Sequence, residues 1–393
     1  MKTSAATRTY DGEWVEIGVE VTRDADPSAP DRLWYRIERR HESLLTDTMD
    51  PFVLATLFAA MRTGEDLHVG GGVTGTLLDN LDEFQSAWLQ WRPERYHRVT
   101  ITAEEELPDR AGPDDRSAVQ TFSGGVDSAF TTIRHVSQAA GRQSLQLTGA
   151  VMVHGFDIPL TERESYESLR HRSAPLLQKV GVDLIPVVTN FRSLWHSDLG
   201  HWEDAFGTGM TSVLTLVGGG FRHGLIASSE PYSSLLLPWG SNPVTDPMLS
   251  GGRMRIHHDA AGVDRNEKVA GLARLWPEGA DNLRVCWQGE HKDRNCCRCE
   301  KCIRTILNFR VSGSEVPASF PHEVTEEHIL SLRGLSEAHV NPLRQILAAA
   351  QARRLEEPWV SALADCIAAN EEEIAQGISY EGGFPLLATD SGR

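Results

Sequence analysis

The feature that most constrains this chain is the hexapeptide S-G-G-V-D-S at residues 123–128. An apolar run typical of a buried strand, residues 118–122, precedes it, and a stretch typical of a helix, residues 128–139, follows it. Glycines without a Cβ let backbone N–H groups close around anionic oxygens, and a helix start presents its positive dipole end to them. The hexapeptide therefore predicts a phosphate-binding loop between a strand and a helix.

The residues of this loop indicate how a nucleotide would bind. Gly124 and Gly125 are expected to bring backbone amides to the phosphates, while Ser123 and Ser128 add hydroxyl donors. Asp127 would repel a bare polyphosphate, so its presence predicts a Mg²⁺ ion that bridges carboxylate and phosphates. The loop lacks the Gly-Lys-Ser/Thr ending of the Walker A pattern. An ordinary glycine turn is the structural alternative.

The S-G-G-x-D-S pattern after a first strand resembles the PP-loop of the N-type ATP pyrophosphatases. Members of that superfamily cleave ATP to AMP and pyrophosphate, usually to adenylate a carbonyl or carboxylate oxygen that a nucleophile then displaces. The resemblance implies a parallel-sheet, HUP-like ATPase domain that uses ATP and Mg²⁺. It also implies catalytic roles for Ser123 and Asp127.

The cysteines form a second motif. Cys286, Cys296, Cys299 and Cys302 have the spacing C-x9-C-x2-C-x2-C. Clustered cysteines in a chain that reads as cytosolic indicate a metal site rather than disulfides, and four thiolates suit a closed, structural Zn²⁺ site. An iron–sulfur cluster and free thiols in a turn are the alternatives. Cys297 is an alternative second ligand, although it would break the two-residue gap to Cys299.

The PP-loop followed by this cysteine set is similar, in motif order, to the cyanodeazaguanine synthase group of the queuosine pathway. Members of that group carry a four-cysteine zinc site near the C-terminal end of the ATPase domain. The resemblance covers residues 117–310. Because the chain extends well beyond this range on both sides, the substrate of that group is not carried over.

Alternating runs after the loop predict the architecture. Apolar runs at residues 147–153, 183–188 and 224–227 are separated by amphipathic runs at residues 162–180 and 202–217. Such βαβ alternation predicts a parallel sheet covered by helices on both faces.

We expect an α/β fold in three parts. Residues 1–115 are predicted to form an α/β N-terminal domain for substrate or partner binding, residues 116–320 the PP-loop ATPase domain with the cysteine cluster, and residues 321–393 a helical extension. The acidic, proline-bearing segment 103–117 is predicted to be a linker. Residues 70–75 satisfy the dinucleotide pattern G-x-G-x-x-G but lack its acidic partner, so they are interpreted as a flexible glycine turn.

Ligands of parallel α/β sheets bind at the carboxyl ends of the strands. This places His154, residues 189–192 and residues 228–230 beside the loop. His154 is expected to contact the ribose or the substrate, with a structural role as the alternative. Arg265 and Lys268 share one face of a helix start and are expected to reach phosphate oxygens as catalytic residues, with solvated surface charge as the alternative.

Composition limits the partners. With 38 Lys and Arg against 55 Asp and Glu, the net charge is −17. This charge disfavours tRNA and anionic membranes, and it favours a small-molecule or carrier-bound carboxylate as substrate. No apolar run approaches the ~20 residues needed to cross a bilayer, so a cytoplasmic protein is expected. The sequence leaves the oligomeric state open and is compatible with a homodimer.

Together these features predict an AMP-forming, ATP-dependent ligase that adenylates a carboxylate or carbonyl for attack by ammonia or an amine. Two alternatives stay open: ATP-dependent sulfur transfer, and a non-catalytic nucleotide-binding interaction module. Sulfur transfer typically uses an enzyme cysteine, and only Cys297 and Cys366 lie outside the predicted metal site. The apolar loop at residues 233–247 is expected either to cover a substrate or to pack into the core.

Overall fold

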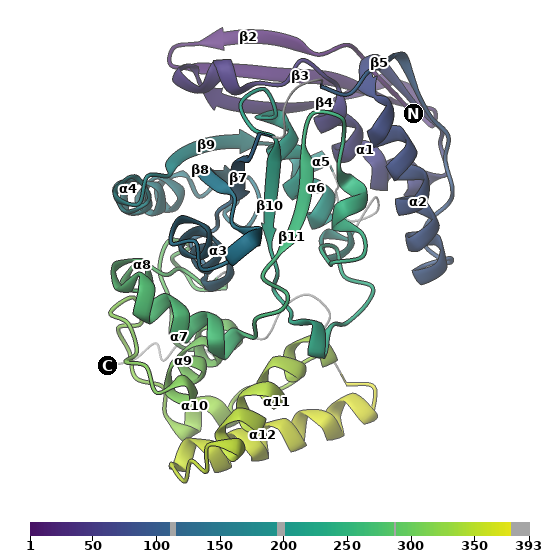
Figure 1. Ribbon diagram of the computed structural model, residues 1–393. Coiled ribbons are helices and arrows are strands. Elements are labelled where there is room, and N and C mark those ends of the chain that lie inside the picture. The colour runs from purple at the N-terminus through teal and green to yellow at the C-terminus, as the bar shows by residue number, and fades with distance from the viewer. Residues whose placement is uncertain (111–114, 195–200, 287, 379–393) are drawn as a thin grey trace.

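The computed structural model describes residues 1–110, 115–194, 201–286 and 288–378 (Figure 1). Within these residues the chain forms eleven strands that join in one sheet. They are β1 (Lys2–Thr3), β2 (Thr7–Asp11), β3 (Trp14–Arg23), β4 (Asp26–Glu38), β5 (Leu67–Thr74), β6 (Ile101–Leu107), β7 (Ser117–Thr121), β8 (Gln146–His154), β9 (Asp183–Thr189), β10 (His223–Ala227) and β11 (Arg255–Asp259). The strand order is β11-β10-β7-β8-β9-β4-β3-β1-β5-β6, and β2 pairs with β3.

Helices alternate with several of the strands after β4, and a group of helices follows the last strand. They are α1 (Asp50–Thr63), α2 (Gly75–Trp91), α3 (Val126–Val136), α4 (Arg163–Lys179), α5 (Phe191–Leu194), α6 (Trp202–Leu216), α7 (Arg265–Leu275), α8 (Pro277–Asp281), α9 (Glu300–Ser312), α10 (Glu326–Leu330), α11 (Glu337–Ala352) and α12 (Pro358–Ala375). Short 3-10 turns are η1 (Arg39–Leu44), η2 (Gly141–Gln143), η3 (Tyr232–Ser234) and η4 (Asp246–Leu249).

The strands from β7 onward pair with one another in parallel, as predicted from the βαβ alternation. Each of the pairs β11·β10, β10·β7, β7·β8 and β8·β9 is parallel. Successive strand residues face two different cores: Val119 and Val151 pack in the cluster that includes α1 and α6, whereas Ala118 and Ala150 pack in the cluster that includes α3, α7 and α9. Burial on both faces explains why these strands read as apolar runs.

The N-terminal strands extend the same sheet. Strand β4 pairs antiparallel with β9, and β3 pairs antiparallel with β4. Leu33 and Phe52 belong to the same buried cluster as Ile185, and the Tyr35 hydroxyl donates to the Ser212 hydroxyl at 3.0 Å. The predicted domain boundary at residue 115 therefore does not separate two cores.

Two sequence predictions in this region are wrong. The segment predicted to begin a linker at residue 103 contains most of β6, which pairs in parallel with β5 at the end of the sheet. The glycines at residues 70–72 lie inside β5 rather than in a flexible turn. Close packing explains them, because a Cβ on Gly70 would lie 2.7 Å from the Ser4 backbone and one on Gly72 would lie 2.7 Å from the Leu107 side chain.

The C-terminal segment is helical, as predicted. Helix α11 packs against α9 and α12, and α10 packs against α12 (Figure 1). The last part of the predicted extension, residues 379–393, lies outside the described residues. Among the described helices, none combines the length and the apolar character of a membrane span.

Candidate functional site

The S-G-G-V-D-S segment connects the carboxyl end of β7 to the start of α3. Gly124 has a φ of 76°, a left-handed conformation in which most side chains would be strained. The Ser123 hydroxyl accepts a hydrogen bond from the Gly125 amide at 3.3 Å, and the Ser128 hydroxyl donates to the Gly125 carbonyl at 3.1 Å. Within the described chain no side chain caps α3, so its first-turn amides can serve an anionic ligand.

Asp127, in the first turn of α3, is held by two cations from α7. Arg265 Nη2 lies 2.7 Å from one carboxylate oxygen of Asp127, and Lys268 Nζ lies 3.1 Å from the other. Burial by itself would raise the pKa of Asp127, but the charges of Arg265 and Lys268 outweigh it and hold the pKa below its usual value. The structure thus brings together Asp127, Arg265 and Lys268, which were predicted to be catalytic.

The two cations are also bound to the backbone after β10. Lys268 is 2% exposed, and its Nζ donates to the Ser228 carbonyl at 2.5 Å. Arg265 donates to the Ser229 carbonyl at 3.3 Å. These contacts exclude the alternative that Arg265 and Lys268 are solvated surface charges.

The predicted Mg²⁺ ligand is engaged in ion pairs. Both carboxylate oxygens of Asp127 contact a cation, so the carboxylate would bind Mg²⁺ only after its pair with Arg265 or Lys268 opens. The described geometry fits a different use of Asp127, which is to orient two cations beside the loop.

Further charged residues, which the motifs did not single out, surround the loop. The Arg284 amide donates to the Gly124 carbonyl at 2.8 Å, and the Arg284 guanidinium lies 3.7 Å from Asp157, just beyond β8. On α9, Arg304 pairs with Glu300 at 2.9 Å, and the charge of Arg304 also lowers the pKa of Asp127. A signal was present in the sequence, because Arg284 and Arg304 each stand two positions from a cysteine of the metal motif.

Glu230 completes this charged group beyond the end of β10. Burial raises the pKa of Glu230, and the nearby charges of Arg265 and Arg304 offset part of that effect. The surroundings of the loop therefore lower the pKa of one carboxyl group, Asp127, and raise that of another, Glu230, near the same cations.

His154 lies at the end of β8, on the predicted rim, but its ring is engaged within the fold. The ring stacks on Tyr166 with centroids 4.6 Å apart, and its Nε2 donates to the Pro159 carbonyl at 2.9 Å. The residue is 6% exposed, and burial lowers the pKa of its imidazole. This packing favours a structural role for His154. Its contact with the ribose or the substrate stays a prediction.

The four predicted metal ligands come together. The sulfur atoms of Cys286, Cys296, Cys299 and Cys302 all lie within 4.8 Å of one another. The Cys286–Cys299 and Cys296–Cys302 sulfur distances are 3.7 and 3.9 Å. A tetrahedral ion with Zn–S bonds of about 2.3 Å requires sulfur atoms about 3.8 Å apart. The cluster therefore can hold a single metal ion such as zinc, and its size favours one ion over an iron–sulfur cluster.

The backbone around these cysteines supports thiolate ligands. The amides of Arg298 and Cys299 donate to the Cys296 sulfur at 3.4 and 3.3 Å, and the Gly289 amide donates to the Cys286 sulfur at 3.2 Å. Hydrogen bonds to sulfur favour its charged form. Cys297 has a φ of 57° and does not belong to the cluster, which supports Cys296 as the second ligand.

The apolar loop at residues 233–247 packs into the core in part, and its role in covering a substrate stays a prediction. Its second half is packed, because Asn242, Thr245 and Asp246 are fully buried. Its first half is more open, with Leu237 41% exposed. Helix α11 contacts this first half, since Asn341 donates to the Ser234 carbonyl at 2.9 Å.

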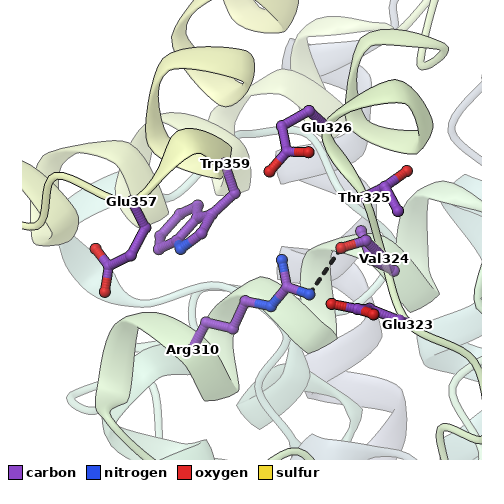
Figure 2. Close-up of a pocket in the computed structure, with 7 residues that line it drawn as sticks. All are labelled: Arg310, Glu323, Val324, Thr325, Glu326, Glu357 and Trp359. Carbon is purple, nitrogen blue, oxygen red and sulfur yellow. Dashed lines mark hydrogen bonds between the residues drawn. The ribbon is translucent and has the colours of Figure 1, made fainter.

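A separate pocket of about 420 Å³ lies among the C-terminal helices (Figure 2). It is lined by exposed carboxylates, a tryptophan and an arginine that donates to the Val324 carbonyl at 2.7 Å. The lining residues are Arg310, Glu323, Val324, Thr325, Glu326, Glu357 and Trp359. None of the predicted site residues is among them, and the excess of carboxylates disfavours a polyphosphate there.

Comparisons of the chain with protein-family models, with curated proteins and with solved structures give no match. Functional inference therefore depends on the residues around the loop and the cysteine cluster.

Proposed function

We propose that this protein is an ATP-dependent, AMP-forming ligase that adenylates a carboxylate or carbonyl oxygen and releases pyrophosphate. The observation that carries the proposal is the glycine loop at residues 123–128. It lies at the carboxyl end of a central parallel strand, with the buried Lys268 and the largely buried Arg265 held beside it by Asp127. Such a loop combines backbone amides, a helix start and fixed cations, which are the groups that stabilise a departing pyrophosphate.

In this proposal each residue has a distinct role. Gly124 and Gly125 let the backbone approach the phosphates, and Ser123 donates its hydroxyl. Lys268 and Arg265 neutralise charge on the leaving pyrophosphate, while Asp127 keeps both cations in position before ATP arrives. Preorganised charges of this kind need no rearrangement when charge develops on the leaving group.

Nitrogen is the proposed nucleophile. Sulfur transfer through an enzyme cysteine requires a reactive thiolate outside the metal site. Burial raises the pKa of Cys297, and it raises the pKa of Cys366 to about 11. Both residues are 1% exposed. Thiols of this kind are protonated and inaccessible at neutral pH, which favours ammonia or an amine over a cysteine-borne sulfur.

The cysteine cluster is proposed to hold structural Zn²⁺. Four thiolates close the coordination shell, so no position is left for a catalytic water. Bound zinc would cross-link the segment that ends at Cys286 to the start of α9, and these two elements carry Arg284 and Arg304.

The experiment is a screen of the metal-loaded full chain with ATP and Mg²⁺ against carboxylate-bearing metabolites, in the presence of ammonium or an amine. Formation of AMP and pyrophosphate in equal amounts, dependent on one substrate class, is the expected result. Asp82→Asn is the matched control for Asp127→Asn, because the Asp82 side chain lies on α2 and is 80% exposed. Production of ADP and phosphate, or cleavage unaffected by Asp127→Asn, would contradict the proposal.

A further inference from the structure

Arg284 is a buried cation with part of its hydrogen-bonding capacity unused. The residue is 3% exposed. Its Nε donates to the Lys292 carbonyl at 2.7 Å, and its Nη1 is 3.7 Å from Asp157, which is too long for a hydrogen bond. Its Nη2 is buried and has no hydrogen-bond partner among the described residues. An unsatisfied buried donor on a charged group is costly, so its presence points to a ligand.

The backbone of Arg284 is fixed against the phosphate-binding loop. Its amide donates to the Gly124 carbonyl at 2.8 Å. A Cβ added to Gly124 would lie 3.7 Å from the Arg284 Cβ, and one added to Gly125 would lie 3.7 Å from the Arg284 carbonyl. The Arg284 side chain therefore begins next to the turn whose amides are proposed to receive the phosphates.

The cysteine segment holds Arg284 in this place. The amides of Val285 and Cys286 both donate to the Asn295 side chain, at 2.8 and 3.3 Å. Asn295 in turn donates to the Leu283 carbonyl at 2.9 Å and directly precedes Cys296. Residues on both sides of Arg284 are thus connected to the cysteine cluster.

We propose that Arg284 is a further phosphate-binding residue of this site, whose Nη2 donates to an oxygen of the nucleotide polyphosphate bound at Gly124 and Gly125. The inference rests on the proposed function, since it deepens the description of the same site. A guanidinium suits this role because it is always charged and directs several N–H donors in one plane. Asp157 is the counter-charge that orients it in the absence of the nucleotide.

Calorimetric titration of the metal-loaded full chain with pyrophosphate tests the proposal. Arg284→Gln is expected to weaken pyrophosphate binding by about 10- to 100-fold, the loss typical of a hydrogen bond to a charged group. Arg284→Lys keeps the charge but not the planar fork, so its affinity for pyrophosphate is expected to lie between those of the wild type and Arg284→Gln. The control is Arg294→Gln in the same cysteine-rich segment, where the side chain is 64% exposed. It should bind pyrophosphate like the wild type.

The outcomes separate the two proposals. If the wild type binds pyrophosphate and Arg284→Gln binds it equally well, the role of Arg284 is overturned and the proposed function stands. Failure of the wild type to bind either pyrophosphate or ATP overturns the proposed function. If Arg284→Gln loses its metal, a crystal structure of the wild type soaked with pyrophosphate tests whether Arg284 contacts the ligand. An oxygen within about 3 Å of Nη2 is expected, and a bound pyrophosphate beyond its reach overturns the inference.

Discussion

Asp127→Asn removes a carboxylate that both Arg265 and Lys268 contact, at 2.7 and 3.1 Å. Lys268, which is 2% exposed, would keep a neutral partner in the Ser228 carbonyl. Removing one partner of a buried ion pair costs about 3 to 5 kcal/mol. The Asp127 side chain is 19% exposed, and Asn retains an oxygen for one of the two cations. We therefore expect the free energy of unfolding to fall by about 2 kcal/mol, which is closer to the cost of losing one charged hydrogen bond than to that of breaking a buried ion pair.

Urea unfolding at pH 7, compared with the exposed control Asp82→Asn, measures this loss. The control should stay within about 0.5 kcal/mol of the wild type. Under conditions where Asp127→Asn is folded, pyrophosphate release should fall by about 10²- to 10³-fold, because the cations beside the loop are no longer held. Ser123→Ala should slow release to a similar extent. Near-normal AMP formation by both variants would refute the assignment of the loop.

Three further predictions follow from the cysteines and from the ionisation of Asp127. Elemental analysis should find one zinc per chain, and Cys299→Ser or Cys302→Ser should lose the metal and unfold, because the binding free energy of a structural metal is folding free energy; iron with sulfide, or a folded metal-free chain, would contradict this. The lowered pKa of Asp127 stabilises the fold above the unfolded Asp value of about 4, and this contribution is lost as the pH falls through the lower folded value. The difference in unfolding free energy between the wild type and Asp127→Asn should therefore shrink below about pH 4, and a constant difference down to about pH 2 would show that Asp127 is not involved. Cys297→Ser and Cys366→Ser should keep most activity, with ¹⁵N from labelled ammonium or amine in the product; an inactive serine variant that still binds metal and ATP, or a product that gains the mass of sulfur, would move the reaction to thiolation.

The loop and the metal cluster were accessible from sequence because each depends on residues that are close in the chain. Residues 123–128 form a continuous segment, and the strand before it and the helix after it can be predicted from the periodicity of apolar residues. The cysteines gather within 17 positions, from Cys286 to Cys302, so their spacing alone predicts a shared site. The choice between Cys296 and Cys297 needed the structure, because the left-handed backbone at Cys297 is not visible in the spacing.

Other features depend on contacts between distant segments. Strand β4 joins β9 although the predicted boundary lies between them, and no local pattern specifies that pairing. Arg284 reaches the loop only because the segment before Cys286 folds against Gly124. The glycines at residues 70–72 read as a turn because their function is close packing against β1 and β6, which periodicity does not report.

The most direct test of the account is a crystal structure of the metal-loaded chain with Mg²⁺ and a non-hydrolysable ATP analogue. Phosphate oxygens are expected within hydrogen-bonding distance of the backbone amides at residues 124–128 and of Lys268 or Arg265, on the side of the loop that Arg284 approaches. A nucleotide bound elsewhere, for example in the acidic pocket beside Trp359, with the loop at residues 123–128 unoccupied, would contradict it.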